Sequence, residues 1–263
     1  MSRVALCVAT AVGALVLAAP APAQPPIVRP PAGRETPLVT LGGQLFAGNC
    51  AVCHGTRGRG VPRPRRSASG TARVGAGPPL IGVGRRAADF YLRTGYMPLG
   101  DPSEQPERRR VEFSEREIQA LEAYVDSLGN GPPVPAPHPE RGSVAEGLTL
   151  FSQHCAGCHQ IVGEGGIVTG GRVPPLDRAT PTQIAEAVRI GPYLMPRFSE
   201  RDIGDDQLDS LIAYVEYAKH PRDAGGWAIN HLGPFPEGMV TWGIAAVALV
   251  GCCVLLGARL KHS

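Results

Sequence analysis

The sequence contains the run Cys50-Ala-Val-Cys53-His54 and, in its second half, the run Cys155-Ala-Gly-Cys158-His159. Thiols spaced in this way lie one helical turn apart, where they can add to the two vinyl groups of a haem while the next imidazole lies under the iron. A single copy is also compatible with half of a zinc site or with a thioredoxin-like dithiol. Zinc would need all four thiolates to converge, and thioredoxin chemistry needs a βαβ unit that this sequence lacks. The pair therefore predicts two covalently bound haem c groups, attached at Cys50, Cys53, Cys155 and Cys158, with His54 and His159 as axial ligands.

Two methionines are the expected sixth ligands of the two irons. Met97 and Met195 are the only methionines between the leader and the apolar tail, and each directly precedes a proline. A methionine in a core is usually a gap filler, but the paired contexts Arg93-Thr94-Gly95-Tyr96-Met97-Pro98 and Arg189-Ile190-Gly191-Pro192-Tyr193-Leu194-Met195-Pro196 favour ligation. A thioether favours ferrous iron and raises the reduction potential. With both axial positions filled, neither iron can bind oxygen or peroxide, so we expect electron transfer and no catalytic site in this chain.

A proline pair stands between the histidine and the methionine of each motif. The segments are Pro78-Pro79-Leu80 and Pro174-Pro175-Leu176. A backbone carbonyl that accepts the N–H of a ligating imidazole fixes the ring and tunes the iron. The candidates for this carbonyl are Pro78 or Pro79 in the first copy and Pro174 or Pro175 in the second.

The similarity between the two halves extends beyond the motifs, so we read them as copies of one module. Phe113-Ser-Glu-Arg-Glu-Ile118 corresponds to Phe198-Ser-Glu-Arg-Asp-Ile203. In each, a serine followed three residues later by an acid is typical of a helix N-terminus, so we expect a capped helix after Ser114 and after Ser199. The first copy carries two insertions, an Arg-rich stretch after His54 and a polar stretch from Leu99 to Arg110.

Composition limits the remaining possibilities. The net charge of +3 is too small to indicate nucleic-acid binding. Aromatic residues make up only 5% of the chain, which suggests that a large flat cofactor adds bulk to the core. Three of the seven cysteines lie outside the motifs, one in the leader and two in the apolar tail, so none is left for a structural disulfide. The Arg-rich stretch is expected to be a solvated loop, with a docking surface for an acidic partner or for haem propionates as the alternative.

Both ends of the chain carry membrane signals. An apolar run from Val4 to Ala19, followed by Ala21-Pro22-Ala23, has the layout of a secretory signal with a cleavage site. The segment from Met239 to Ala258 contains no charged residue and is long enough for a transmembrane helix. Trp242 lies near its start, and Arg259, Lys261 and His262 follow its end, so the C-terminus should be cytoplasmic and the haem domains extracytoplasmic.

The predicted fold is all-α, with two tandem haem domains and one C-terminal transmembrane helix. The layout is a signal peptide at 1–23 (with a retained anchor as the alternative), a Pro-rich linker at 24–40, a first domain at 41–131, a second Pro-rich linker at 132–143, a second domain at 144–220, a juxtamembrane segment at 221–238, the transmembrane helix at 239–258 and a cytoplasmic tail at 259–263. We refer to residues 41–131 and 144–220 as the first and second repeats.

These residues resemble class I cytochrome c modules, seen here twice. The two modules, then Gly225-Gly226-Trp227, Gly233-Pro-Phe-Pro-Glu-Gly-Met239 and a single span, look like the dihaem cytochrome c subunit of the actinobacterial cytochrome bcc (menaquinol–cytochrome c reductase) complex. Gly77-Pro-Pro-Leu-Ile-Gly-Val-Gly84 and Leu194-Met-Pro-Arg-Phe-Ser199 strengthen the resemblance, which covers almost the whole chain after the leader. The long insertion after His54 departs from the family pattern.

The resemblance implies an electron-transfer subunit of a quinol–cytochrome c reductase, a respiratory translocase. Its partners would be a cytochrome b subunit, a Rieske iron–sulfur protein that donates electrons, and a cytochrome c oxidase that accepts them within a supercomplex. The alternative is an independent membrane-tethered dihaem carrier or the cytochrome subunit of a periplasmic dehydrogenase. A dihaem peroxidase or a haem-based gas sensor would need an open axial position, and both Met-Pro elements argue against that.

Overall fold

The computed structural model describes residues 26–31, 33, 35–61, 77–99, 105–221 and 234–260. The expected signal peptide, the greater part of the Arg-rich insertion and most of the juxtamembrane segment lie outside these residues. The chain divides into two compact units. The first unit runs to His138 and also includes Gly166–Pro174 and Ala179–Asp205, whereas the second comprises Pro139–Gly165, Pro175–Arg178 and the chain from Asp206 onward. The second repeat therefore contributes residues to both units.

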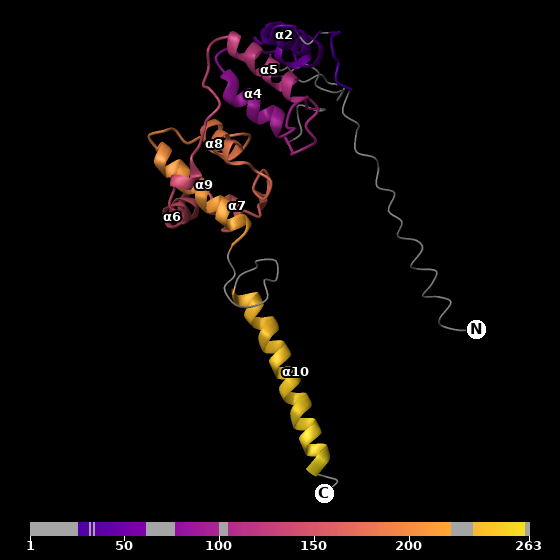
Figure 1. Cartoon of the computed structure of the whole chain (residues 1–263), viewed down its shortest axis with the longest axis vertical. Helices are drawn as coiled ribbons and strands as arrows, with labels where there is room; N and C mark the ends of the chain where they lie inside the picture. Colours follow the sequence, from indigo (N-terminus) through magenta and orange to yellow (C-terminus); the bar gives the residue numbers. More distant parts are fainter. Residues whose placement is uncertain are drawn as a thin grey trace, which may run out of the picture. The chain divides into compact units, whose positions relative to one another are not determined.

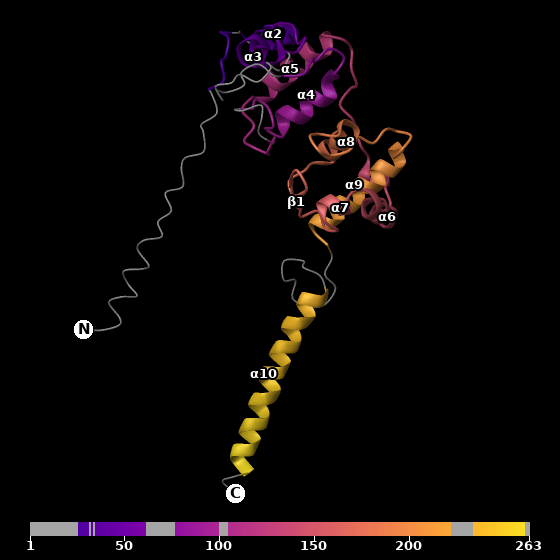
Figure 2. The same cartoon turned by 180° about the vertical axis from the view of Figure 1, so that it is seen from behind.

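Helices are the main regular structure of the described chain (Figure 1). The first unit contains α2 (Leu38–Asn49), α3 (Ala51–His54), α4 (Gly84–Arg93), α5 (Glu115–Ser127) and α8 (Pro181–Ile190). The second contains the 3-10 helix η1 (Pro139–Arg141), α6 (Val144–His154), α7 (Ala156–His159), α9 (Asp205–Lys219) and α10 (Pro234–Leu260). Two short strands in the first unit, β1 (Gly166–Val168) and β2 (Gly171–Val173), pair antiparallel with Gly166 opposite Val173 (Figure 2). The predicted all-α class with a C-terminal apolar helix is confirmed.

The core of the first unit forms where α2 packs against α5. Its buried residues are Leu41, Leu45, Phe46, Leu92, Phe113, Ile118, Ala120 and Leu121. The two helices approach so closely that a Cβ on Gly42 would lie 1.9 Å from the carbonyl oxygen of Ala120. Beside this crossing the rings of Phe46 and Tyr124 lie 5.0 Å apart. Only a residue without a side chain fits on α2 at this point, and the crossing brings the end of α2, where Cys50 lies, against the core.

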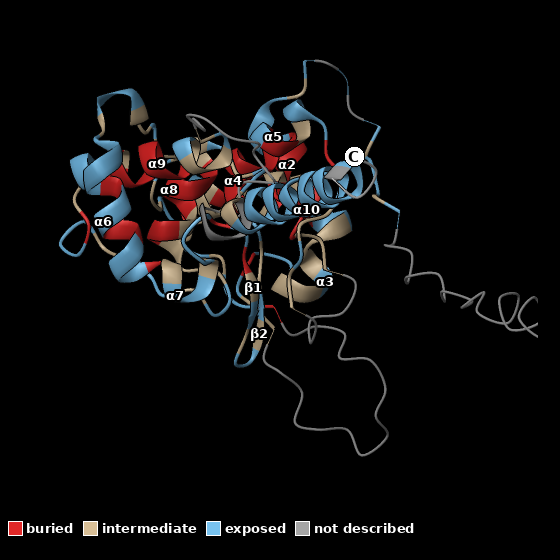
Figure 3. Ribbon diagram, turned by 90° about the horizontal axis from the view of Figure 1, so that it is seen from below, coloured by how far each residue is buried: buried red, intermediate tan, exposed pale blue. Residues whose placement is uncertain are grey.

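The second unit repeats this arrangement with α6 and α9. A Cβ on Gly147 of α6 would lie 1.9 Å from the carbonyl oxygen of Ser210 on α9. The rings of Phe151 and Tyr214 are 5.3 Å apart. The buried faces of these helices appear red in Figure 3. The same backbone contact therefore positions the segment before each cysteine motif.

The serine that was expected to cap a helix does so in the first repeat but not in the second. Ser114 is the N-cap of α5, and its N–H donates to Oε2 of Glu117 at 2.8 Å, which completes a capping box. Ser199 makes the matching contact, from its N–H to Oδ2 of Asp202 at 2.7 Å, but α9 begins only at Asp205. The expectation that a helix starts directly after Ser199 is therefore wrong. The box there closes a single turn, and Gly204, a poor helix former, separates that turn from α9.

Helix α10 has the properties of a membrane span. Its segment Gly238–Arg259 is 22 residues long, has a mean hydropathy of 2.4 and is not buried by other parts of the described chain. The exposed surface of α10 is pale blue in Figure 3. A stretch of about 20 apolar residues is enough to cross a bilayer, so this helix could anchor the protein in a membrane. It includes the predicted span 239–258.

Replacing Gly42 by alanine should strongly destabilise the first unit. The new methyl group would overlap the carbonyl oxygen of Ala120, so α2 and α5 must separate. Overpacking of this kind typically costs about 1–3 kcal/mol, and we expect the loss of unfolding free energy to reach the upper end of that range. Denaturant titration of the purified protein measures it.

Gly33→Ala is the control, because a Cβ at Gly33 would meet no atom within 4 Å. An unchanged denaturation midpoint in Gly42→Ala would contradict the proposed role of the close crossing.

Candidate haem attachment sites

The first cysteine motif forms a single helical turn at the end of α2. The N–H of Cys53 donates to the carbonyl of Cys50 at 3.1 Å, and the N–H of His54 donates to the same oxygen at 2.9 Å. Gly55 then turns the chain with a φ of 77°. The turn places the two thiols three positions apart on one helical turn, which is the spacing that thioether attachment requires.

A loop that follows the motif positions the His54 imidazole. Its Nδ1 lies 2.8 Å from the carbonyl oxygen of Pro78. The preceding residue, Gly77, donates its N–H to the carbonyl of Cys53 at 2.9 Å and is buried. Donation from Nδ1 to Pro78 leaves Nε2 available for a metal. Between the two candidates in this repeat, the geometry favours Pro78 over Pro79.

Met97 follows α4 within the same unit. Its N–H donates to the carbonyl of Tyr91 at 3.0 Å, and the side chain is half-buried. The adjacent Tyr96 is buried against the ring of Phe90, with the ring centroids 5.6 Å apart. This aromatic cluster fixes the segment that carries the thioether. The structure thus places His54 and Met97 in one compact unit.

The second cysteine motif has the same local geometry in the second unit. The N–H of Cys158 donates to the carbonyl of Cys155 at 3.1 Å, and the N–H of His159 donates to it at 2.9 Å. Gln160 occupies the position of Gly55 and has a φ of 60°. A further bond, from the N–H of Gly165 to the carbonyl of His159 at 3.0 Å, closes the loop after the motif.

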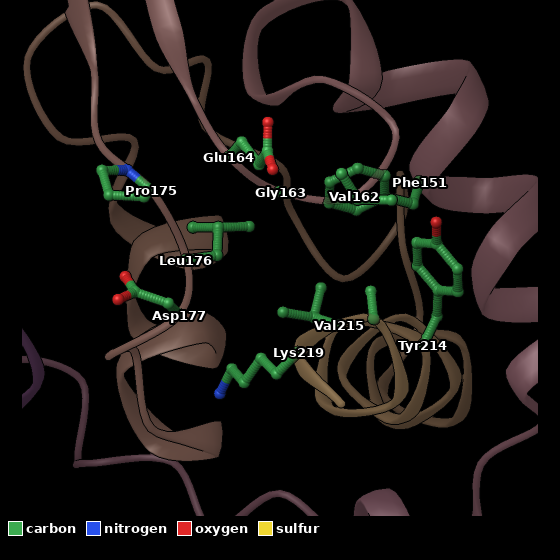
Figure 4. A pocket seen from close by; sticks show the side chains of 11 residues that line it. Phe151, Val162, Gly163, Glu164, Pro175, Leu176, Asp177, Tyr214, Val215 and Lys219 are labelled. Carbon is green, nitrogen blue, oxygen red and sulfur yellow. The ribbon is translucent and has the colours of Figure 1, made fainter. Parts of the chain in front are cut away.

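A cavity of about 340 Å³ lies in the second unit (Figure 4). Its lining residues are Phe151, Val162, Gly163, Glu164, Pro175, Leu176, Asp177, Tyr214, Val215, Ala218 and Lys219. Most of these side chains are apolar, and Leu176 is held there by the bond from its N–H to the carbonyl of Gly163 at 2.8 Å. The volume falls within the range of about 300–1,000 Å³ that is usual for cofactor sites. The apolar part of the lining suits a ligand with an apolar surface.

The Met195 segment belongs to the first unit, and a buried arginine at the end of α8 holds the chain that follows it. Nη1 of Arg189 donates to the carbonyls of Ser199 at 3.0 Å and Ile203 at 2.7 Å, and Nη2 donates to Oδ1 of Asp205 at 2.8 Å. Met195 itself donates its N–H to the carbonyl of Pro192 at 3.0 Å. Because Met195 and Pro174 lie in one unit and His159 in the other, the pairing of these residues around one haem stays a prediction.

The environment of the first thiol in each motif fits thioether chemistry better than thiolate chemistry. Burial, followed by the neighbouring Cys53, raises the pKa of Cys50 to about 12. Burial, followed by Cys158, raises the pKa of Cys155 to about 11. Redox-active dithiols depend on a lowered thiol pKa, whereas burial raises the pKa of both residues. Among the described residues no group of three or more His, Cys, Asp or Glu side chains could hold a metal ion.

These features together define a c-type cytochrome. A family model described as "Cytochrome c" matches residues 39–129, and one described as "Cytochrome C oxidase, cbb3-type, subunit III" matches residues 142–215. Each matched segment contains one of the two cysteine motifs. Two cytochrome c domains imply covalently bound haem c.

Comparison with curated proteins narrows the class further. The chain is 38% identical over 233 residues to the cytochrome bc1 complex cytochrome c subunit of Mycobacterium tuberculosis (strain ATCC 25618 / H37Rv), which covers 84% of this chain and 78% of that protein. It is 34% identical over 243 residues to the subunit of the same name from Corynebacterium diphtheriae (strain ATCC 700971 / NCTC 13129 / Biotype gravis), covering 86% of this chain and 82% of that protein. This chain belongs to the family of cytochrome bc1 complex cytochrome c subunits, as its resemblance predicted.

A more distant similarity concerns an oxidase subunit. The cbb3-type cytochrome c oxidase subunit CcoP of Azospirillum sp. (strain B510) is 30% identical over 200 residues, which is 66% of this chain and 60% of that protein.

The sequence reasoning missed two arginines that support the methionine segments. Arg189 ties the end of α8 to the start of α9, as described above. In the first repeat, Nη1 and Nη2 of Arg93 donate to the two carboxylate oxygens of Glu115 at 2.7 and 2.8 Å, so the end of α4 is tied to the start of α5. The sequence did contain a sign of this role, because Arg93 and Arg189 are the first residues of the two matching segments that end in Met-Pro. These segments alone do not show which groups the two guanidinium groups bind.

Replacing Gly77 by alanine should alter one haem and leave the other unchanged. A Cβ there would lie 2.5 Å from the carbonyl oxygen of Cys53 and 2.9 Å from Nδ1 of His54, so Pro78 must move away from the imidazole. A weaker bond makes the imidazole a poorer electron donor. We expect the midpoint potential of one haem to rise by on the order of 30–60 mV, given about 59 mV per tenfold change for one electron.

Redox titration of the visible spectrum measures both midpoints. Gly33→Ala is the control, because a Cβ at Gly33 meets nothing within 4 Å. Two unshifted midpoints in a fully haem-loaded Gly77→Ala protein would show that the Pro78 contact does not tune the iron.

Proposed function

We propose that this protein is the dihaem cytochrome c subunit of a respiratory menaquinol–cytochrome c reductase. It accepts electrons from a Rieske iron–sulfur protein and delivers them to a cytochrome c oxidase. The observation that carries the proposal is the duplicated Cys-x-x-Cys-His module with its Met-Pro partner, on a chain similar to bc1 complex cytochrome c subunits along most of its length. The apolar helix α10 supports attachment to the membrane that contains such a complex.

In this proposal each repeat holds one haem. Cys50 and Cys53 attach the first, with His54 and Met97 as axial ligands, and Cys155 and Cys158 attach the second, with His159 and Met195. A bound haem c supplies reversible one-electron chemistry, and His/Met ligation raises its potential. The role of the polypeptide is to exclude water, to fill both axial positions and to orient the imidazoles. The contact between His54 and Pro78 supports this orienting role in the first repeat. No catalytic site of its own is needed.

The proposed partners are the cytochrome b and Rieske subunits and, in a supercomplex, the oxidase. The haem domains would lie outside the membrane and the C-terminus in the cytoplasm. Trp242 near the start of α10 and the basic residues after its end support this orientation.

A second candidate is a cytochrome subunit of an oxidase. The match of residues 142–215 to the cbb3-type subunit III model and the similarity to CcoP favour it. The lower identity and smaller coverage make it the weaker candidate.

The decisive experiment is gentle solubilisation of the tagged protein from its own membrane, followed by identification of the copurifying subunits and a redox-titrated spectrum. Two low-spin haems c with a cytochrome b and a Rieske protein are expected. Copurification with a cbb3 oxidase core would favour the second candidate. Two low-spin haems with no b-type partner would leave only an independent carrier, and a high-spin haem would reopen the enzyme class.

Replacing Met97 or Met195 by histidine should lower the potential of one haem at a time. Imidazole stabilises ferric iron relative to thioether, and axial ligands span about 0.8 V in all, so we expect a fall of on the order of 0.1–0.2 V in each variant. Spectroelectrochemical titration resolves the two midpoints, and the double variant should lower both.

The third methionine after the leader offers a control. Met239 lies in the apolar helix, and Met239→Leu should leave both midpoints unchanged. If Met97→His or Met195→His behaved like Met239→Leu, that methionine would not be an axial ligand.

A further inference from the structure

Three buried acidic residues meet inside the first unit, where α4 packs against both α5 and α8. Asp89 on α4 is 4% exposed, Glu122 on α5 is 7% exposed and Glu186 on α8 is 0% exposed. Figures 1 and 2 show α4 between α5 and α8. Helix α4 leads directly into Met97, and α8 leads into Met195. The acids therefore lie between the two helices that precede the proposed methionine ligands.

The carboxyl groups contact one another, and the Asp89 carboxylate also accepts a hydrogen bond from Arg93. Asp89 is within hydrogen-bonding reach of the carboxyl groups of both Glu122 and Glu186. Neither oxygen of Glu186, nor Oε1 of Glu122, receives a hydrogen bond from an N–H or O–H group of the described chain. Ionised carboxylates can only accept hydrogen bonds. Such contacts become favourable only when a proton lies between the two oxygens.

The nearby positive charge does not balance three carboxylates. Nε of Arg93 donates to Oδ1 of Asp89 at 2.6 Å, and the same guanidinium lies 3.8 Å from Oε1 of Glu122. It is also bound through two nitrogens to the exposed Glu115. The other charged groups that act on the cluster or on its immediate neighbours are Arg85, Arg86, Arg189, Arg197 and Glu200.

Of these other arginines, two are bound elsewhere. Arg85 pairs with Asp126 at 3.2 Å, and Arg189 pairs with Asp205. Burial, followed by repulsion from Arg197 and Arg189, lowers the pKa of Arg86, while Glu186 and Glu200 act on it in the opposite direction.

The pKa values of Glu122 and Glu186 reflect this shortage of positive charge. Burial, followed by the charge and hydrogen bond of Asp89, raises the pKa of Glu186 to about 9. Burial, followed by the hydrogen bond and charge of Asp89, raises the pKa of Glu122 to about 8. Removing a carboxylate from water without a counter-ion is costly enough that the group takes up a proton instead. A metal ion is the other way to neutralise such a cluster, but the described residues contain no arrangement that could hold one.

We propose that Asp89, Glu122 and Glu186 form a proton-binding site, and that the bound protons hold α8 against α4 and α5. The packing of α4 and α8, the helices that precede Met97 and Met195, then depends on the pH of the surrounding solution. Proton binding itself does not depend on the proposed function. An effect of these protons on electron transfer between the repeats does rest on the proposed function.

The direction of the pH effect follows from the raised pKa values. The folded protein binds more protons than the unfolded chain between the ordinary carboxyl pKa of about 4.5 and the folded value of about 9 for Glu186. The stabilisation is complete below about 4.5 and is lost as the pH rises toward 9. For each proton involved, the unfolding equilibrium constant should rise by up to about tenfold per pH unit.

Infrared spectroscopy of the haem-loaded full chain in detergent tests the site directly. Protonated carboxyl groups absorb at higher frequency than carboxylates and shift in heavy water. At pH 7 the wild type should show this absorption, and it should disappear as the pH is raised beyond 9. Absence of the absorption at pH 7 in the wild type overturns the proposal without the need for any variant.

The variants Glu186→Gln and Asp89→Asn then test whether the absorption comes from the carboxyl groups of the cluster. Glutamine keeps the shape and neutral charge of the protonated acid, so Glu186→Gln should remove part of the absorption and flatten the dependence of unfolding on pH between 6 and 9. The exposed Glu35 supplies the control, and Glu35→Gln should behave as wild type. An absorption that survives unchanged in both Glu186→Gln and Asp89→Asn would overturn the assignment. Visible spectra and copurifying subunits report separately on the proposed function, so failure of one is distinguishable from failure of the other.

Discussion

The close crossing of α2 with α5, and of α6 with α9, is the contact on which each haem-binding repeat depends. At Gly42 and Gly147 a helix backbone lies directly against the carbonyl of another helix, without any side chain between them. This approach brings Phe46 and Phe151 against tyrosines of the partner helix. Because Cys50 and Cys155 follow these phenylalanines by one turn, the crossing determines where the thiols lie. A bulkier residue at the crossing would displace the motif as a whole.

On the methionine side of each repeat, charged hydrogen bonds of arginine hold the chain in place. Arg93 and Arg189 stand at the ends of the helices that lead to the methionines, and each binds the first residue of a later helix, Glu115 or Asp205. The guanidinium of Arg189 also satisfies backbone carbonyls of the intervening turn. A planar group with five donors can hold several acceptors at once. Packing therefore places the histidine side, and charged hydrogen bonds place the methionine side.

The sequence predicted the features that depend on residues close together in the chain. The cysteine turns, the cap at Ser114 and the apolar span follow from local spacing, and the structure contains all three. The start of α9 was missed because the same serine signature at Ser199 closes only one turn before Gly204. The partners of Arg93 and Arg189 were missed because a hydrogen bond across more than ten residues leaves no periodic trace. The residues expected to hold each haem are consistent with the local geometry, and their ligation stays a prediction.

The acids at the junction of α4, α5 and α8 were hidden from the sequence for a related reason. Asp89, Glu122 and Glu186 each stand in an ordinary amphipathic helix, where an acid is normally solvated. Only the packing of three helices removes them from water together. An apolar trio of similar size would pack as well without the penalty of buried charge, so stability does not account for their presence. Protons bound by these acids offset that penalty, and because the protons can leave, the helices that lead to the two methionines can respond to pH in a way that an apolar contact could not.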